Sequence, residues 1–120
     1  MAVRDVAVVQ NDDGSMTVSW TGLTNATSDT GRAWTPGQHT DKTVQAVGTF
    51  GAGGTVAIQG SNDGGTTWAV LHNPQGTDLA IQDSEPLMIS EGPQQIRPAI
   101  TAGDGATDID VYIHVALRGT

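Results

Sequence analysis

The sequence contains no cysteine, and its 120 residues include only five basic side chains against thirteen acidic ones. The absence of cysteine excludes a disulfide framework, a thiolate metal cluster and a cysteine nucleophile. The formal net charge of −8 argues against nucleic acid and anionic membranes as direct partners, because both are bound through clustered lysine and arginine. We therefore expect no direct nucleic-acid contact and no membrane contact.

Long apolar runs are also absent. No stretch approaches the roughly 20 residues that a membrane-spanning helix needs, and residues 1–5 do not begin an apolar signal-peptide core. We therefore expect a soluble protein made in the cytoplasm. A chain of 120 residues fits the usual domain size of about 100–150 residues, so we expect a single domain over residues 1–120.

The residues that are plentiful favour strands. Sixteen glycines and five prolines are scattered along the chain, and β-branched residues lie between them. Apolar and polar residues alternate clearly over residues 16–21 and 108–118, while no helical period occurs. With about eight short strands, this pattern predicts an all-β protein. The expected architecture is an antiparallel β-sandwich of jelly-roll or immunoglobulin-like kind.

Three segments of the chain carry further expectations. Residues 1–9 form an opening strand that could extend as an N-terminal arm. Residues 22–41 have no apolar period and predict a long loop in the N-terminal half, either a flexible surface loop or a functional segment. Pro98 lies within an apolar run and lacks an N–H group, which predicts an edge strand or a bulge at that position.

The sharpest local motif runs from residue 61 to residue 68. It matches the Ser-x-Asp-x-Gly-x-Thr-Trp pattern of the Asp-box, which is familiar from sialidase-type β-propellers as a hairpin turn. In such a turn the aspartate accepts backbone N–H groups, glycine adopts positive φ and tryptophan packs as an anchor. We interpret it as a structural turn, with a glycan contact as the alternative; its residues are Ser61, Asp63, Gly65, Thr67 and Trp68.

Catalytic signals are weak. The three histidines do not stand at metal-ligand spacing, and no HExxH or GxSxG motif occurs. The Asp-rich turns do not match a calcium-binding loop. We therefore expect no enzymatic activity, no cofactor and no bound metal.

Several pieces between Val47 and Leu117 together resemble a known family. They are the run from Val56 to Trp68, the segment from Leu71 to Gly76, the tetrapeptides at 95–98 and 102–105, and the closing strand. This succession, over a little more than half of the chain, is similar to capsid decoration (cement) proteins of tailed bacteriophages. The resemblance implies a homotrimer on the outer surface of a virion capsid, assembled in the bacterial cytoplasm, which stabilises the shell by bridging subunits of the major capsid protein.

Under this hypothesis, the chain's start and the loop at 22–41 contact the capsid through Arg4, Val6, Arg32 and Trp34. Arg97, Tyr112 and His114 are the candidates for contact between subunits, because Tyr and Arg are common interface anchors. Two alternatives stay open. One is a carbohydrate-binding module that uses Trp34 as an exposed stacking platform. The other is a tail or head-fibre domain of a phage virion.

Overall fold

The computed structural model describes residues 3–12, 14–25, 29–36 and 41–116. Every regular element in these ranges is a strand, and the prediction of an all-β antiparallel sandwich is confirmed. The strands are β1 (Val3–Arg4), β2 (Val6–Gln10), β3 (Met16–Thr24), β4 (Thr30–Gly31), β5 (Asp41–Thr49), β6 (Thr55–Ser61), β7 (Ala69–Val70), β8 (Ala80–Ile81), β9 (Leu87–Ile89), β10 (Gln95–Ala102) and β11 (Asp108–Ala116).

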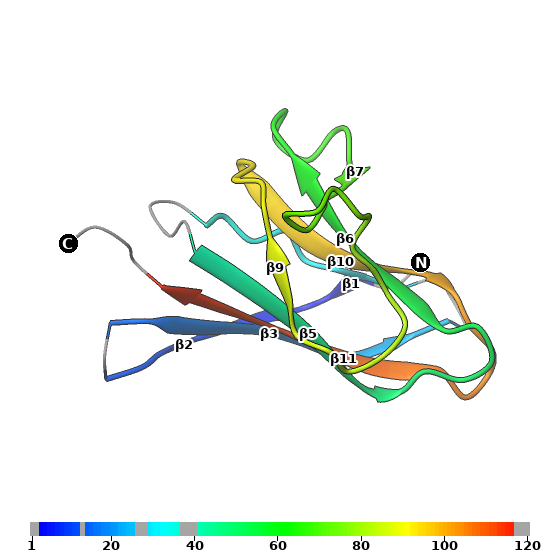
Figure 1. Ribbon diagram of the computed structural model, residues 1–120. Helices are drawn as coiled ribbons and strands as arrows, with labels where there is room; N and C mark the ends of the chain where they lie inside the picture. Colours follow the sequence, from blue (N-terminus) through cyan, green and yellow to red (C-terminus); the bar gives the residue numbers. More distant parts are fainter. Residues whose placement is uncertain (1–2, 13, 26–28, 37–40, 117–120) are drawn as a thin grey trace.

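The strands form two sheets that lie over one another (Figure 1). Sheet A has the order β1-β4-β10-β6-β7, and β8 also pairs with β6. Sheet B has the order β2-β3-β11-β5-β9. All named pairings are antiparallel except that of β1 with β4, which is parallel. The long strands β3, β5 and β11 therefore make up the middle of sheet B.

The core lies between the sheets and consists of the apolar residues that alternate with polar ones along the strands. In β3 and β11 every second side chain points inward, and removal of these apolar side chains from water is the main stabilising term of such a fold. The indole Nε1 of Trp20 donates a hydrogen bond to the Arg32 carbonyl at 2.9 Å, so its polar atom is satisfied inside the core. The largest fully buried side chains are Trp20, Leu23, Ile58, Leu79, Ile81, Ile96, Ile109 and Ile113.

The start of the chain belongs to both sheets rather than standing apart as an arm. Strand β1 pairs with β4 in sheet A, and β2 pairs with β3 in sheet B. Arg4 contacts the buried carboxylate of Asp29 at 2.8 Å, and Thr24 donates its N–H to the same carboxylate oxygen at 3.0 Å. Residues 1–2 of the expected arm lie outside the described residues.

The expected loop over residues 22–41 is partly built into the sandwich. It contains the end of β3, all of β4 and a two-way backbone bridge between Trp34 and Ile96. Trp34 is only 7% exposed and packs in the core, so the expectation of an exposed platform or anchor at this residue is wrong. Its burial follows from the pairing with Ile96. Residues 26–28 and 37–40 lie outside the described residues.

Pro98 lies in an interior strand and not at an edge, which corrects the expectation for this residue. Strand β10 is flanked by β4 and β6. The neighbouring residues Ile96 and Ile100 donate N–H groups to the 29–34 segment, and Pro98 falls between them where a donor is missing. Gly31 leaves the space that the proline ring fills, because a Cβ at Gly31 would lie 2.5 Å from Pro98 Cδ.

Candidate functional site

The outer face of sheet B carries two of the residues that the sequence nominated for subunit contact. Tyr112 and His114 point outward from β11, the middle strand of the sheet, and are exposed. Their cross-strand partners form two rows that run across the sheet. The first row is Val9, Thr17, His114, Thr43 and Met88, and the second is Ala7, Ser19, Tyr112 and Gln45.

Neither row contains an aspartate, glutamate, lysine or arginine. Along β5 and β11, the next residues on this side are the acidic Asp41 and Asp110, and Gln45 donates a hydrogen bond to the carbonyl of Ser84, which stands between Asp83 and Glu85. The exposed fraction is 58% for Val9, 48% for Met88 and 36% for Tyr112. We call these two rows the uncharged face. On a chain with a formal charge of −8, such a face favours contact with another protein surface over permanent exposure to water.

Sequence reasoning missed Val9, Thr43 and Met88 as members of this face. Only the strand register shows that these residues align with His114. One signal was available, because the unbroken apolar run at residues 6–9 places apolar side chains on both sides of a short strand. Arg97, the third residue nominated for subunit contact, lies in β10 of sheet A. The structure therefore does not bring it together with Tyr112 and His114.

The Asp-box segment forms a hydrogen-bonded turn between β6 and β7. The Asp63 carboxylate accepts the N–H groups of Thr66 and Thr67 at 3.1 and 2.8 Å and the Ser61 hydroxyl at 2.8 Å. These donors, with the Thr67 N–H as the largest contribution, lower the pKa of Asp63 to about 2. Gly65 has a φ of 91°, and its carbonyl accepts the Trp68 indole N–H at 3.0 Å. The carboxylate is thus occupied in holding the turn.

The turn presents Trp68 to the outer face of sheet A. The Arg97 guanidinium lies over the Trp68 ring, 4.3 Å from its centroid, and its Nε donates to the Gln59 side-chain oxygen at 2.9 Å. Such stacking of a guanidinium on an indole is a cation–π contact. Burial lowers the pKa of Arg97 below its ordinary value. The stack orders Arg97 but covers one face of the indole, which limits its use as a glycan platform.

The residues nominated for capsid contact do not form one surface, since Val6 belongs to β2 of sheet B and Arg4 to β1 of sheet A. Arg4 is held by Asp29, Val6 is half-buried against the core, and Trp34 is buried. Arg32 is exposed and ion-paired with the exposed Asp5 at 3.0 Å. Arg32 and Arg97 line a common hollow together with Trp68.

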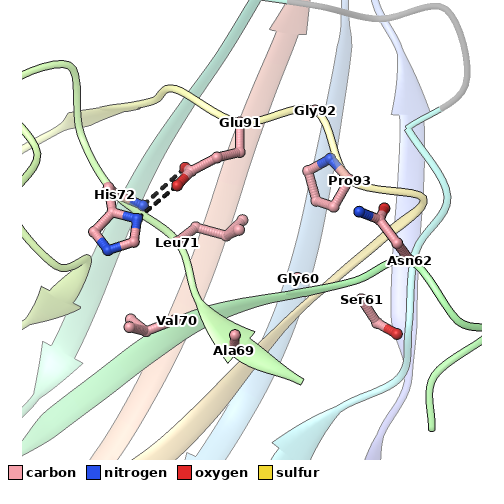
Figure 2. A pocket seen from close by; sticks show the side chains of 10 residues that line it. All are labelled: Gly60, Ser61, Asn62, Ala69, Val70, Leu71, His72, Glu91, Gly92 and Pro93. Atoms are coloured by element: carbon pink, nitrogen blue, oxygen red, sulfur yellow. Dashed lines mark hydrogen bonds and ion pairs between the residues drawn. The ribbon is translucent and has the colours of Figure 1, made fainter. Parts of the chain in front are cut away.

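A second hollow, of about 390 Å³, lies where the segment after β7 meets the segment after β9. Figure 2 shows the Glu91 carboxylate directed at both the backbone N–H and the ring of His72, with distances of 2.8 and 2.6 Å. The other ring nitrogen of His72 lies 3.2 Å from Asp78. Apart from the polar Asn62, the rest of the lining is small or apolar, as at Leu71 and Pro93.

The imidazole is therefore placed between two carboxylates. The hydrogen bond to Glu91 is the largest cause that raises the pKa of His72 above its usual 6.5. Burial alone would raise the pKa of Glu91, but the hydrogen bonds from His72 outweigh it, and the pKa lies below 4.5. With both ring nitrogens engaged, His72 is poorly placed as a metal ligand or general base. Within the described ranges, no three His, Asp or Glu side chains are arranged to hold a metal ion.

Comparison with known proteins yields one informative match. No family model and no curated protein sequence matches this chain. Among solved structures, the SPBc2 prophage-derived protein YomS superimposes with a TM-score of 0.55 and 15% sequence identity, over 91% of this chain and 97% of that one. This likeness shows a shared fold. No helix in the part of the chain that the structure describes is long and apolar enough to cross a membrane.

Proposed function

We propose that this chain is a structural component of a phage virion, which self-associates as a trimer and binds the outer surface of the capsid. There it would stabilise the shell by bridging neighbouring subunits of the major capsid protein. The observation that carries self-association is the uncharged face of sheet B on an otherwise acidic chain. The phage setting is supported by the fold shared with a prophage-derived protein and by the resemblance of residues 47–117 to capsid decoration proteins.

Charge explains why sheet B is the better candidate for contact between copies. Three chains that each carry −8 repel one another, and like charges placed opposite each other across an interface cost several kcal/mol. Contact through the uncharged face keeps the carboxylates of neighbouring copies apart. Exposed Val9, Met88 and Tyr112 supply apolar and aromatic area for such a contact.

The test places a charge in the middle of this face. Thr43→Glu puts a carboxylate beside His114, and Thr101→Glu, at an exposed position of β10 in sheet A, is the matched control. We expect the wild-type chain and the control to have three times the 12.4 kDa mass of one chain by light scattering after size exclusion. Thr43→Glu should give the mass of one chain with an unchanged far-ultraviolet circular dichroism spectrum. A trimer that tolerates Thr43→Glu would contradict the use of this face.

The capsid role is tested separately. Wild-type protein should sediment with purified capsids that lack it, and Thr43→Glu should sediment far less. Sedimentation with purified tails or head fibres, and not with capsids, would overturn the capsid assignment in favour of a tail or fibre component.

A further inference from the structure

The hollow on the outer face of sheet A has an unusual composition for this chain. It has a volume of about 310 Å³ and lies between the segment after β4, strand β10 and the Asp-box turn. Arg32 and Arg97 both line it, and no aspartate or glutamate does. The whole sequence contains only five basic residues. Two of them thus face one small space, where their mutual repulsion favours the binding of an anion.

The Arg97 side chain is fixed in advance of any ligand. Its Nε is bound to Gln59 and its guanidinium plane rests on Trp68. Its terminal amino groups make no hydrogen bond and no ion pair with any residue that the structure describes. A planar guanidinium with free terminal donors matches the two oxygens of a carboxylate.

Arg32 is available in a different way. Its partner Asp5 is exposed, and so is Arg32 itself. An exposed ion pair of this kind contributes little to the stability of the fold. A second carboxylate can therefore compete for Arg32 at low cost.

Gln95 adds an acceptor to the same hollow. Its side-chain oxygen is buried and has no hydrogen-bond partner among the described residues, although a buried polar atom without a partner is costly. The oxygen lies against Gly65, where a Cβ would come within 3.1 Å of it. The oxygen is covered in this conformation, so an N–H or O–H group of a ligand would satisfy it after the Gln95 side chain turns toward the hollow.

We propose that this hollow binds the carboxylate of an aspartate or glutamate on a partner protein, with Arg97 and Arg32 holding the carboxylate and Gln95 accepting an N–H from the same segment. A protein carboxylate is favoured over an acidic sugar, because the Arg97 guanidinium already covers a face of Trp68 that a sugar ring would stack on. The identity of this partner rests on the proposed function. If sheet B forms the contact between copies, sheet A is the side that binds the capsid.

The site is tested on the isolated protein. N-acetyl-aspartate N-methylamide is titrated into ¹⁵N-labelled protein while the Arg97 Nε–H and Trp68 Nε1–H signals are followed by NMR. N-acetyl-asparagine N-methylamide is the neutral control, and glucuronate and inorganic phosphate are tested in parallel. We expect the aspartate compound to give saturable shifts at a lower concentration than glucuronate or phosphate, and the asparagine compound to give none. Arg32→Gln should weaken binding about tenfold, as for the loss of a charge-assisted hydrogen bond, and Asp5→Asn should strengthen it about threefold.

The outcomes separate the site from the function. No shift with the aspartate compound, or equal shifts with the asparagine compound, would overturn the site. Saturation by glucuronate or phosphate at lower concentration than by aspartate would overturn the assignment to a protein carboxylate. If Arg32→Gln no longer binds the aspartate compound but still sediments with capsids as the wild type does, the hollow is not the docking site. If the wild-type protein binds the aspartate compound but does not sediment with capsids, the proposed function is refuted and the binding site is retained.

Discussion

Gly31 occupies a position where two core side chains leave no room for a Cβ atom. An added Cβ would lie 2.5 Å from both Pro98 Cδ and Trp20 Cδ1. The small residue thus solves the problem created by Pro98, whose ring replaces an N–H group inside a strand of sheet A. Gly31 thus makes room for both the Pro98 ring and the Trp20 indole.

Gly31→Ala should therefore destabilise the fold by about 1–3 kcal/mol, the usual cost of forcing extra atoms into a packed core. Equilibrium unfolding in urea measures this. Gly105→Ala is the control, because a Cβ there meets nothing within 4 Å, and a change within about 0.5 kcal/mol is expected. Equal stability of the two variants would mean that β10 and the 29–34 segment can move apart without loss.

The two early tryptophans show what single residues reveal before a structure is known. The alternation over residues 16–21 puts Trp20 on the same side of its strand as Met16 and Val18, and all three side chains are buried in the structure. Trp34 has no such context. It is buried by an isolated bridge to Ile96, 62 positions further along the chain. No local pattern encodes a contact of that separation, and the free-platform expectation failed for this reason.

At the scale of elements, the contact between His72 and Glu91 ties together segments that belong to different sheets, while His72 and Asp78 are also joined by a backbone bridge. His72 follows β7 and Glu91 follows β9, and β7 and β9 belong to different sheets. The Ser90 N–H also donates to the His72 carbonyl at 3.0 Å. The ion pair therefore fastens sheet A to sheet B at the rim of the sandwich.

This contact should make stability depend on pH. The pKa of His72 is raised above 6.5, so its contribution is complete below pH 6.5 and is lost as pH rises through the folded pKa. Glu91 acts in the opposite sense, because its lowered pKa gives a contribution that is present above pH 4.5 and lost on acidification. The free energy of unfolding should consequently fall on going from about pH 6 to pH 8.

His72→Gln should flatten this decline, as measured by urea unfolding at a series of pH values. Thr101→Gln, at an exposed position of β10 in sheet A, is the control and should retain the wild-type slope. If both variants keep the slope, the pH dependence comes from another group.

Element prediction succeeded for the long strands β3 and β11 and missed several strands of two residues. The segments that became β3 and β11 have nine residues each, enough for an alternating pattern to be read. Strands β1, β4 and β8 have two residues each and no period at all. Their existence depends on partners elsewhere in the chain. The uncharged face could not be predicted for the same reason, because its two rows are defined by the register between strands.

At the scale of the whole molecule, the sandwich has two unlike outer sides. Sheet B offers the uncharged face, and sheet A offers the hollow with Arg32 and Arg97. The remaining surface carries most of the thirteen acidic residues. A protein that bridges others needs two separate contact surfaces, and opposite faces of a sandwich supply them without interference.

The two contacts should respond to salt in opposite directions. Raising sodium chloride shortens the screening length from about 10 Å at 0.1 M to about 3 Å at 1 M, which reduces repulsion between acidic chains and should strengthen the trimer. The same change should weaken binding of the aspartate compound to the hollow. Sedimentation equilibrium and NMR titration at low and high salt measure the two effects. A trimer that weakens with salt would indicate that ion pairs hold it together.

The position of β11 in sheet B has a consequence for how the protein is made. This strand, at residues 108–116, lies between β3 and β5, which are synthesised much earlier. Until the ribosome has released residue 116, β3 and β5 are left with facing edges unpaired. The central pairings of sheet B therefore form only after nearly all of its residues have been synthesised. A nascent chain that stops before residue 108 exposes unpaired strand edges, which can pair with other chains.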